Sequence, residues 1–401
     1  MLTHLGDMPV ATFIRDYWQK RPLLIRQCFP GFECPFDEND LAGLALEEAV
    51  ESRIIYEKRQ GKPWQLERGP FRDKKLRKLP EVGWTLLIQG LDQWLPEMSD
   101  LLDQFRFLPG WRLDDIMASF APPGGSVGPH YDHYDVFLIQ ALGRRRWQVG
   151  PVCDEQSPRV NGTPLRILDG FPVEQEWELE PGDVLYLPPA VAHHGVALEN
   201  GITLSVGFRS PTQAELLSSF ADYWIPQIDS PAFDRDYADL GRHTGRIPPE
   251  IVDDFKKSLT RLLERPNEMH SWMGRFLSHP KTDAVVEAPL EDSLPDDAEL
   301  IEALREAPIR ARWNDGSRYL YQCYEMPSKQ TVVELFVDGQ GFVLPADAQT
   351  FVEQLCHSNT VPEGLLSEAV KRPDLADVIV KLIRSGSLRV EHCDENDTGH
   401  I

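Results

Sequence analysis

The chain has 401 residues, 41% of them hydrophobic and 26% charged, which indicates an ordinary globular protein of two or three domains. Its formal net charge of -23 argues against a general nucleic-acid binder and suits a basic partner, although acidity can also serve solubility alone. No apolar run long enough for a membrane span and no secretory signal are visible. Six scattered cysteines without a CxxC pair predict reduced thiols in the cytoplasm.

The first 110 residues mix helical patterns with loops, and the pattern changes at about residue 111. Short strand-like runs broken by glycine and proline follow, at residues 111–121, 135–143, 144–150, 176–189 and 201–210. Strands at this spacing predict a β-sandwich or barrel rather than alternating βα units. We therefore expect a catalytic domain over residues 1–210, with its barrel core at about 111–210.

Residues 211–284 predict a small helical module. Thr212 and Glu215 form a capping box ahead of one amphipathic helix, and a second helix carries Ile251, Phe255 and Leu259 on one face. Two such helices with little chain between them often complete a core by pairing with another subunit, so we expect a homodimer. An acidic linker at 285–297 then leads into an α+β, winged-helix-like domain over 285–401.

The stretch GPHYDHYDVF (128–137) contains a candidate pair of metal ligands. If it is a strand, His130, Asp132 and Tyr134 share one face and His133 lies on the other. An imidazole and a carboxylate on one face can converge on one ion, but a third ligand must come from elsewhere. His-X-Asp by itself is a weak signal, because most such pairs are coincidental.

The third ligand is expected in PGDVLYLPPAVAHHGVAL, which resembles the second cupin motif through Gly182, Pro188 and His193. It departs from that motif in having Ala190 in place of the usual glycine. The spacing from Pro188 favours His193, and His194 is the alternative. Two histidines and one carboxylate form a facial triad, a ligand set that suits Fe(II) and leaves positions open for a cosubstrate and dioxygen.

Arg145 is predicted to lie on the buried face of its strand, because alternation places it with Trp147 and Val149. A buried arginine needs a counter-ion. One candidate is a protein carboxylate; the other is the distal carboxylate of 2-oxoglutarate, which a guanidinium can hold through two hydrogen bonds.

These motifs, together with DYWQKRPLLI, WRLDDIMASF and SVGFRSPTQAELLSSFADY, resemble the JmjC-domain 2-oxoglutarate oxygenases, and more closely the bacterial ribosomal oxygenases. The resemblance is continuous over about residues 10–225. It implies a double-stranded β-helix (cupin/JmjC jelly roll) with flanking helices, followed by a helical dimerisation module and a winged-helix domain. It also implies that His130, Asp132 and His193 bind iron and that Arg145 binds 2-oxoglutarate.

The family resemblance also favours a substrate-binding role for Asp115, Met117, Tyr134 and Ser205. A carboxylate, a thioether, an aromatic ring and a hydroxyl near iron would suit a guanidinium side chain. On the residues alone, the favoured alternative is that Asp115 caps a loop and Met117 fills the core.

The sequence therefore predicts an Fe(II)- and 2-oxoglutarate-dependent protein hydroxylase with succinate and CO2 as coproducts. The resemblance implies that the substrate is an arginine of large-subunit ribosomal protein sixteen, hydroxylated at the β-carbon. Neither direct nucleic-acid binding nor membrane association is expected. The alternatives are a JmjC N-methyl demethylase of a basic protein, a cupin isomerase or lyase that does not need Arg145, and a non-catalytic scaffold that binds ribosomal proteins.

Overall fold

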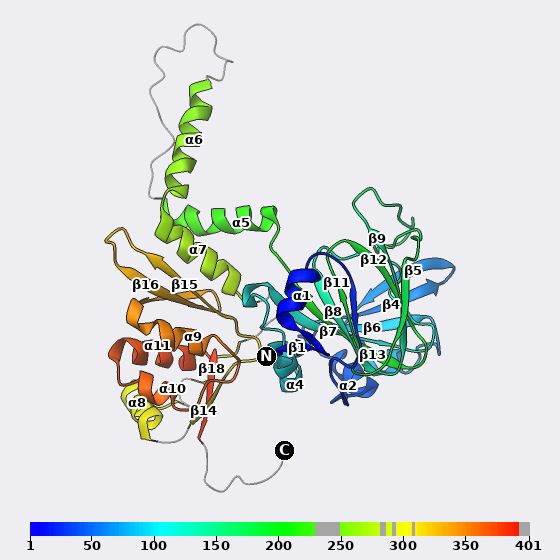
Figure 1. Cartoon of the computed structure of the whole chain (residues 1–401), viewed down its shortest axis with the longest axis horizontal. Helices are drawn as coiled ribbons and strands as arrows, with labels where there is room; N and C mark the ends of the chain where they lie inside the picture. Colours follow the sequence, from blue (N-terminus) through cyan, green and yellow to red (C-terminus); the bar gives the residue numbers. More distant parts are fainter. Residues whose placement is uncertain (229–248, 281–285, 291–293, 307–308, 393–401) are drawn as a thin grey trace.

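The computed structural model describes residues 1–228, 249–280, 286–290, 294–306 and 309–392. The part predicted to be catalytic (residues 1–210, the catalytic part) lies on one side of the molecule. The described residues from 294 onward (the C-terminal part) lie on the other side, and helices connect the two parts (Figure 1). None of the helices in the described ranges is long and apolar enough to span a membrane.

The catalytic part is built on two antiparallel sheets that face each other, as predicted for a cupin-type jelly roll. The large sheet has the order β3-β11-β8-β13-β7-β6-β4-β5, and the small sheet has the order β10-β9-β12. The strands of the large sheet are β3 (Leu23–Ile25), β4 (Ser52–Arg59), β5 (Lys62–Arg68), β6 (Trp84–Ile88), β7 (Leu113–Ala121), β8 (Asp135–Leu142), β11 (Val184–Leu187) and β13 (Gly201–Phe208). Those of the small sheet are β9 (Arg145–Val152), β10 (Gln175–Leu179) and β12 (Val191–Ala197).

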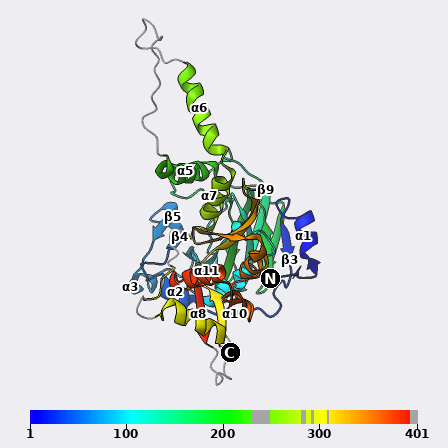
Figure 2. The same ribbon diagram turned by 90° about the vertical axis from the view of Figure 1, so that its left-hand side faces the viewer.

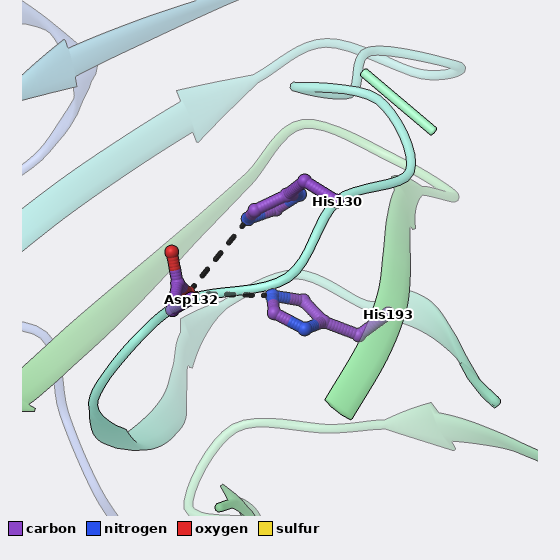
Figure 3. Close-up of side chains that lie close together, drawn as sticks. All are labelled: His130, Asp132 and His193. Carbon is purple, nitrogen blue, oxygen red and sulfur yellow. Dashed lines mark ion pairs between the residues drawn. The ribbon is translucent and has the colours of Figure 1, made fainter. Parts of the chain in front are cut away.

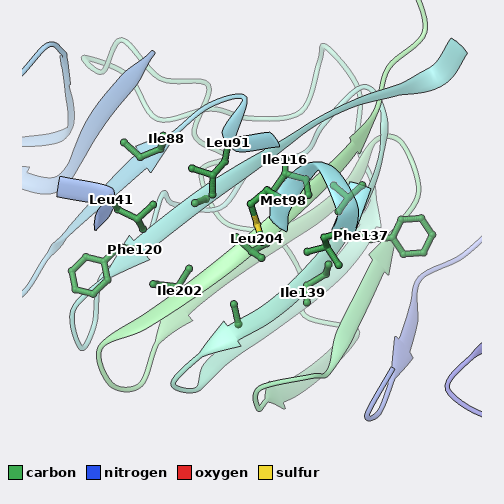
Figure 4. Close-up of a cluster of buried hydrophobic side chains, with 14 of the residues drawn as sticks. Leu41, Ile88, Leu91, Met98, Ile116, Phe120, Phe137, Ile139, Ile202 and Leu204 are labelled. Carbon is green, nitrogen blue, oxygen red and sulfur yellow. The ribbon is translucent and has the colours of Figure 1, made fainter. Parts of the chain in front are cut away.

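Alternation along β8 divides the core into two layers. Val136 and Leu138 face the small sheet and pack with Trp147, whereas Phe137 and Ile139 belong to the larger cluster on the opposite face. Figure 4 shows part of that larger cluster lying along the strands. The helices and short strands of the N-terminal half are β1 (His4–Leu5), β2 (Met8–Pro9), α1 (Val10–Asp16), α2 (Glu38–Leu44), α3 (Asp73–Leu76) and α4 (Pro96–Asp103).

Three helices follow the barrel: α5 (Gln213–Trp224), α6 (Pro249–Leu263) and α7 (Pro266–Ser278). The predicted capping box is present, because Thr212 and Glu215 each accept a hydrogen bond from the other's backbone N–H. Helix α6 has no buried residue and projects away from the rest of the molecule (Figures 1 and 2). Its apolar face is therefore open to a partner.

The C-terminal part has its own hydrophobic core and the mixed α+β composition predicted for it. Its elements are α8 (Asp297–Glu306), β14 (Ile309–Trp313), β15 (Tyr319–Glu325), β16 (Thr331–Val337), β17 (Gln340–Pro345), α9 (Gln349–Leu355), α10 (Leu365–Ala369), α11 (Pro373–Arg384) and β18 (Leu388–His392). Helix α7 packs on its sheet, where Ser271 donates a hydrogen bond to Glu334 at 2.8 Å. The predicted boundary at 284/285 falls outside the described residues, and the domain limits stay predictions.

The end of α4 attaches the catalytic part to the C-terminal part. Asp103 accepts hydrogen bonds from the Ser358 hydroxyl (3.0 Å) and the Asn359 backbone (3.1 Å), and it also pairs with Arg106. The Arg106 guanidinium lies 4.3 Å from the ring centroid of Trp313. These contacts hold the two parts against each other close to the beginning of β7.

Candidate metal centre and adjoining pocket

The segment that carries His130 and Asp132 is a loop, so the prediction that both residues lie on one strand is wrong. Strand β8 begins only at Asp135, and Gly128 before it has a positive φ of 88° that interrupts extended pairing. His130 forms a single bridge to His193 in β12, with a backbone hydrogen bond of 3.0 Å. The loop therefore folds back over β12, which brings His130 and Asp132 next to His193.

His130, Asp132 and His193 form a cluster whose ligand atoms all lie within 4.8 Å of one another. The Asp132 Oδ2 atom is 3.9 Å from His130 Nε2 and 3.6 Å from His193 Nε2 (Figure 3). Of the described residues, these three are the group of histidine, cysteine and carboxylate side chains that could hold a metal ion.

Hydrogen bonds on the far side of each ring fix the imidazole tautomers. His130 Nδ1 lies 2.8 Å from the Gly128 carbonyl and His193 Nδ1 lies 2.9 Å from the Val191 carbonyl. Because a carbonyl can only accept, both Nδ1 atoms carry the proton and both Nε2 atoms present a lone pair. Two lone pairs and a carboxylate oxygen that face one another need a cation between them, so the donor set fits a divalent metal.

His193 is suited to remain neutral, because burial and the nearby His130 lower its pKa to about 4. His194, the alternative ligand, does not belong to the cluster of described residues. His133 is exposed and lies 3.5 Å from Glu155, away from the cluster, and Asp135 is buried where it accepts a hydrogen bond from Tyr186 at 2.6 Å. The neighbouring polar residues of the motif therefore have other partners.

Arg145 is 3% exposed and lies on the inward face of β9, as the alternation predicted. Its Nη1 donates to the Ser119 hydroxyl at 3.1 Å, and no atom of the described residues partners its Nε or Nη2. A protein carboxylate was the alternative partner, and within the described ranges none pairs with this guanidinium. Burial alone lowers its pKa to about 10. Two unpartnered donors of a buried cation fit an anionic ligand.

A single cavity of about 100 Å³ joins all the residues predicted for the site. It is lined by the metal cluster, by Arg145 and by the predicted substrate residues Asp115, Met117, Tyr134 and Ser205. Strands β7, β8, β9, β12 and β13 and the 128–134 loop contribute these side chains. The roles assigned to the individual residues stay predictions.

Asp115 has partners that bear on the loop-capping alternative. It is buried, and its Oδ2 accepts hydrogen bonds from Gln89 Nε2 at 2.6 Å and from the Gly90 backbone at 3.0 Å. It therefore does cap a turn, and it also lines the cavity. These two roles are compatible, because the turn fixes the carboxylate at the cavity wall.

Three cavity residues were not predicted from the sequence. Ser119 is the hydrogen-bond partner of Arg145, and Gln89 connects Arg53 to Asp115 through hydrogen bonds of 2.6 Å each. Gly207 lies against the same residues, because a Cβ placed there would be in van der Waals contact with Asp114 at 3.7 Å and with Asp115 and Tyr134 at 3.8 Å. Alternation along β7 places Ser119 on the same face as Asp115 and Met117 but gives it no role, whereas Gln89 lies beyond a strand end and has no such signal.

Comparison with known proteins agrees with this geometry. The sequence matches the family description "JmjC domain" over residues 100–216 and "ROXA-like winged helix" over residues 261–389. A ribosomal protein uL16 3-hydroxylase of Escherichia coli is 37% identical over 301 residues, covering 75% of this chain and 79% of that protein. A probable ribosomal oxygenase of Haemophilus influenzae is 34% identical over 316 residues, covering 77% and 78%.

Solved structures extend the likeness over nearly the whole chain. A ribosomal oxygenase from Escherichia coli in complex with cobalt and 2-oxoglutarate superposes with a TM-score of 0.80 at 32% identity, covering 97% of this chain and 99% of that one. The same enzyme with cobalt and succinic acid gives a TM-score of 0.79. This chain therefore belongs to the JmjC-domain ribosomal oxygenase family.

Proposed function

We propose that this chain is an Fe(II)- and 2-oxoglutarate-dependent hydroxylase of an arginine in ribosomal protein uL16. The observation that carries the proposal is the position of Arg145: a buried guanidinium with two unpartnered donors in the same cavity as a two-histidine, one-carboxylate cluster. The name of the Escherichia coli relative and the cosubstrate in its structure supply the substrate class.

Each part of the cavity has a distinct task in this proposal. His130, Asp132 and His193 hold the iron, and Arg145 with Ser119 holds the far carboxylate of 2-oxoglutarate. When bound, the iron centre couples dioxygen to 2-oxoglutarate, which leaves as succinate and carbon dioxide, and one oxygen atom enters a substrate C–H bond. The other task of the protein is to orient that bond and exclude water.

The substrate arginine is assigned to the part of the cavity that Asp115, Met117, Tyr134 and Ser205 line. Asp115 supplies a fixed carboxylate for the guanidinium, Tyr134 supplies a ring, and Met117 and Ser205 complete the contact. The charge of Asp132 and, after it, burial raise the pKa of Tyr134, so its hydroxyl stays protonated and can donate a hydrogen bond.

We also propose that two copies of the chain associate through the helical module. The apolar side chains Val252, Phe255, Leu259 and Leu263 of α6 are all exposed in the single chain, as is Leu217 of α5. Among the described residues no element covers this face, and an exposed apolar helix face is typical of a subunit interface. Action in the cytoplasm, without membrane or direct nucleic-acid binding, completes the proposal; the five described cysteines are free thiols, which supports a reducing compartment.

The test is succinate formation by the iron-loaded protein with 2-oxoglutarate and peptides that cover the arginines of uL16. We expect peptide-dependent succinate in the wild type and none in Asp132→Ala, with His133→Ala, outside the cluster, as the active control. Release of formaldehyde from a methylated peptide would instead identify a demethylase. Absence of both metal binding and turnover in the wild type would leave only a binding scaffold.

A further inference from the structure

The cavity beside the metal cluster is too small to hold a polypeptide. Its volume of about 100 Å³ leaves no room for a polypeptide backbone, so the chain that bears the target arginine must lie outside it. A groove of about 710 Å³ adjoins this cavity, and Gln89, Asp114 and Asp115 line both. Because the cavity and the groove share these residues, a polypeptide whose arginine side chain reaches Asp115 has its backbone in the groove.

The groove is formed jointly by the three parts of the molecule. The barrel contributes Glu51 and Trp111, α5 contributes Asp222 and Tyr223, and the C-terminal part contributes Arg318. Figure 1 shows the ends of α5 and α7 between the barrel and the β15–β16 sheet. The winged-helix domain therefore contributes a wall next to the site and is not a separate appendage.

Arg318 connects the C-terminal part to β7, the strand that carries the candidate substrate residue Asp115. Its Nη2 donates to the carbonyl oxygens of Leu113 and Asp114, both at 3.3 Å, and lies 3.5 Å from Asp114 Oδ1. Its own backbone N–H is held by Asp338 Oδ1 at 2.8 Å. Arg318 thus fixes the first residues of β7, directly before Asp115.

The charges that line the groove favour a basic occupant. Arg112 is paired with the buried Asp135 at 3.1 Å, and Arg209 is paired with Glu215. Arg275, which also lines the groove, donates to the carbonyl oxygens of Gly339 and Gly341 at 3.4 and 3.5 Å, so the donors of these arginines already have protein partners. Asp222 is exposed, and the described residues provide it with no ion-pair partner. This carboxylate and the exposed ring of Trp111 line the same groove, and together they suit an extended segment rich in lysine and arginine.

We propose that the winged-helix domain completes the substrate site of this enzyme. The groove binds the basic, extended polypeptide that flanks the target arginine. Arg318 is a positioning residue that holds the start of β7 in place beside that polypeptide. This inference rests on the proposed function, because it takes the flanking segment to belong to the hydroxylated protein.

The test compares Arg318→Gln with Arg312→Gln in the full-length, iron-loaded enzyme. Arg312 is a matched control, because its side chain is also partly exposed and also forms an ion pair with the catalytic part, to Asp100 at 3.1 Å. It lines neither the groove nor the cavity beside the metal cluster. The substrates are a long and a short uL16 peptide around the same arginine, and Asp222→Lys serves as a second groove variant.

We expect Arg318→Gln to raise KM for the long peptide about tenfold, the effect of losing charge-assisted hydrogen bonds, with kcat close to that of the wild type. Arg318→Lys should recover part of the loss, and Asp222→Lys should raise KM for the long peptide only. Affinity for 2-oxoglutarate and the melting temperature should match those of Arg312→Gln, which shows that the effect is not general unfolding.

Three results would overturn the proposal. If the wild type turns over peptides but Arg318→Gln matches Arg312→Gln, the winged-helix domain does not take part in recognition, and the hydroxylase function stands without it. The same conclusion holds if Asp222→Lys affects both peptides equally. If the wild type hydroxylates no uL16 peptide, the proposed function fails and this inference fails with it.

Discussion

Replacing Arg145 by methionine should separate cosubstrate binding from stability, because this buried cation has no protein carboxylate partner in the described residues. Burial lowers its pKa to about 10, and a tenfold change in proton affinity corresponds to about 1.4 kcal/mol, so burial disfavours the charged form by on the order of 3 kcal/mol. Methionine removes this penalty and fills similar apolar space. We therefore expect Arg145→Met without ligand to be as stable as the wild type or more stable.

The same substitution should abolish most of the affinity for 2-oxoglutarate. The two unpartnered donors, Nε and Nη2, are available for two charge-assisted hydrogen bonds, each contributing about 1.5 kcal/mol or more. Their joint loss of about 3 kcal/mol predicts a Kd on the order of a hundredfold higher.

The assay is calorimetric titration of 2-oxoglutarate into the Co2+-loaded protein without oxygen, with thermal unfolding measured in parallel. 2-Oxoglutarate should raise the melting temperature of the wild type and leave that of Arg145→Met unchanged. Arg144→Met is the control, because Arg144 is exposed and pairs with Glu199 at 3.4 Å. Wild-type affinity in Arg145→Met would refute the assignment of this residue to the cosubstrate.

Three further predictions concern the metal, the substrate wall and the helical module. Asp132→Asn should weaken Co2+ binding by at least on the order of a hundredfold in a titration, whereas His133→Ala should leave it unchanged; equal affinities would exclude the cluster as the metal site. Gly207→Leu should press a branched side chain against Asp115 and Tyr134, so peptide turnover should be lost while 2-oxoglutarate still binds; normal peptide turnover would place the substrate elsewhere. Phe255→Asp should yield a monomer in sedimentation, whereas Lys256→Asp, on an exposed polar position of the same helix, should not; a wild type that is already monomeric would contradict the predicted interface.

The sequence predicted the identity of the candidate site better than its local structure. Spacing from Pro188 selected His193, and the structure brings that residue next to His130 and Asp132. The local structure that brings these residues together nevertheless differs from the predicted strand. His130 and Asp132 lie in a loop, and a bridge between His130 and His193 holds this loop against β12. Strand periodicity cannot predict this arrangement, because the arrangement depends on a positive φ at Gly128 and on pairing between residues that are 63 positions apart.

Alternation was informative where a strand is regular. It placed Arg145 with Trp147 on the inward face of β9 and grouped Asp115 with Met117 on β7, and all four line the cavity. The sequence left open whether a carboxylate of the protein pairs with Arg145, because that depends on which side chains from other strands reach it. A departure from the cupin pattern also has a structural meaning: Ala190 adopts a φ of 67°, in the left-handed region that favours the glycine usual at this position.

Contacts between the separate parts of the molecule had no signal in the sequence. Arg318 and Asp114 are far apart along the chain, and nothing in the sequence around either residue points to the other. Their proximity follows from how the C-terminal part docks on α4 through Asp103 and Asn359. The groove beside the metal site therefore becomes visible only in the assembled structure.

The measurement that tests the central claim most directly is mass spectrometry of purified uL16 after incubation with the enzyme, Fe(II), 2-oxoglutarate and isotopically labelled dioxygen. The account predicts one labelled oxygen atom on the β-carbon of a single arginine. It also predicts an equivalent amount of succinate, and neither product with Asp132→Ala. Unmodified uL16 in the presence of an iron-loaded, 2-oxoglutarate-binding enzyme would contradict the account, as would incorporation of oxygen from water.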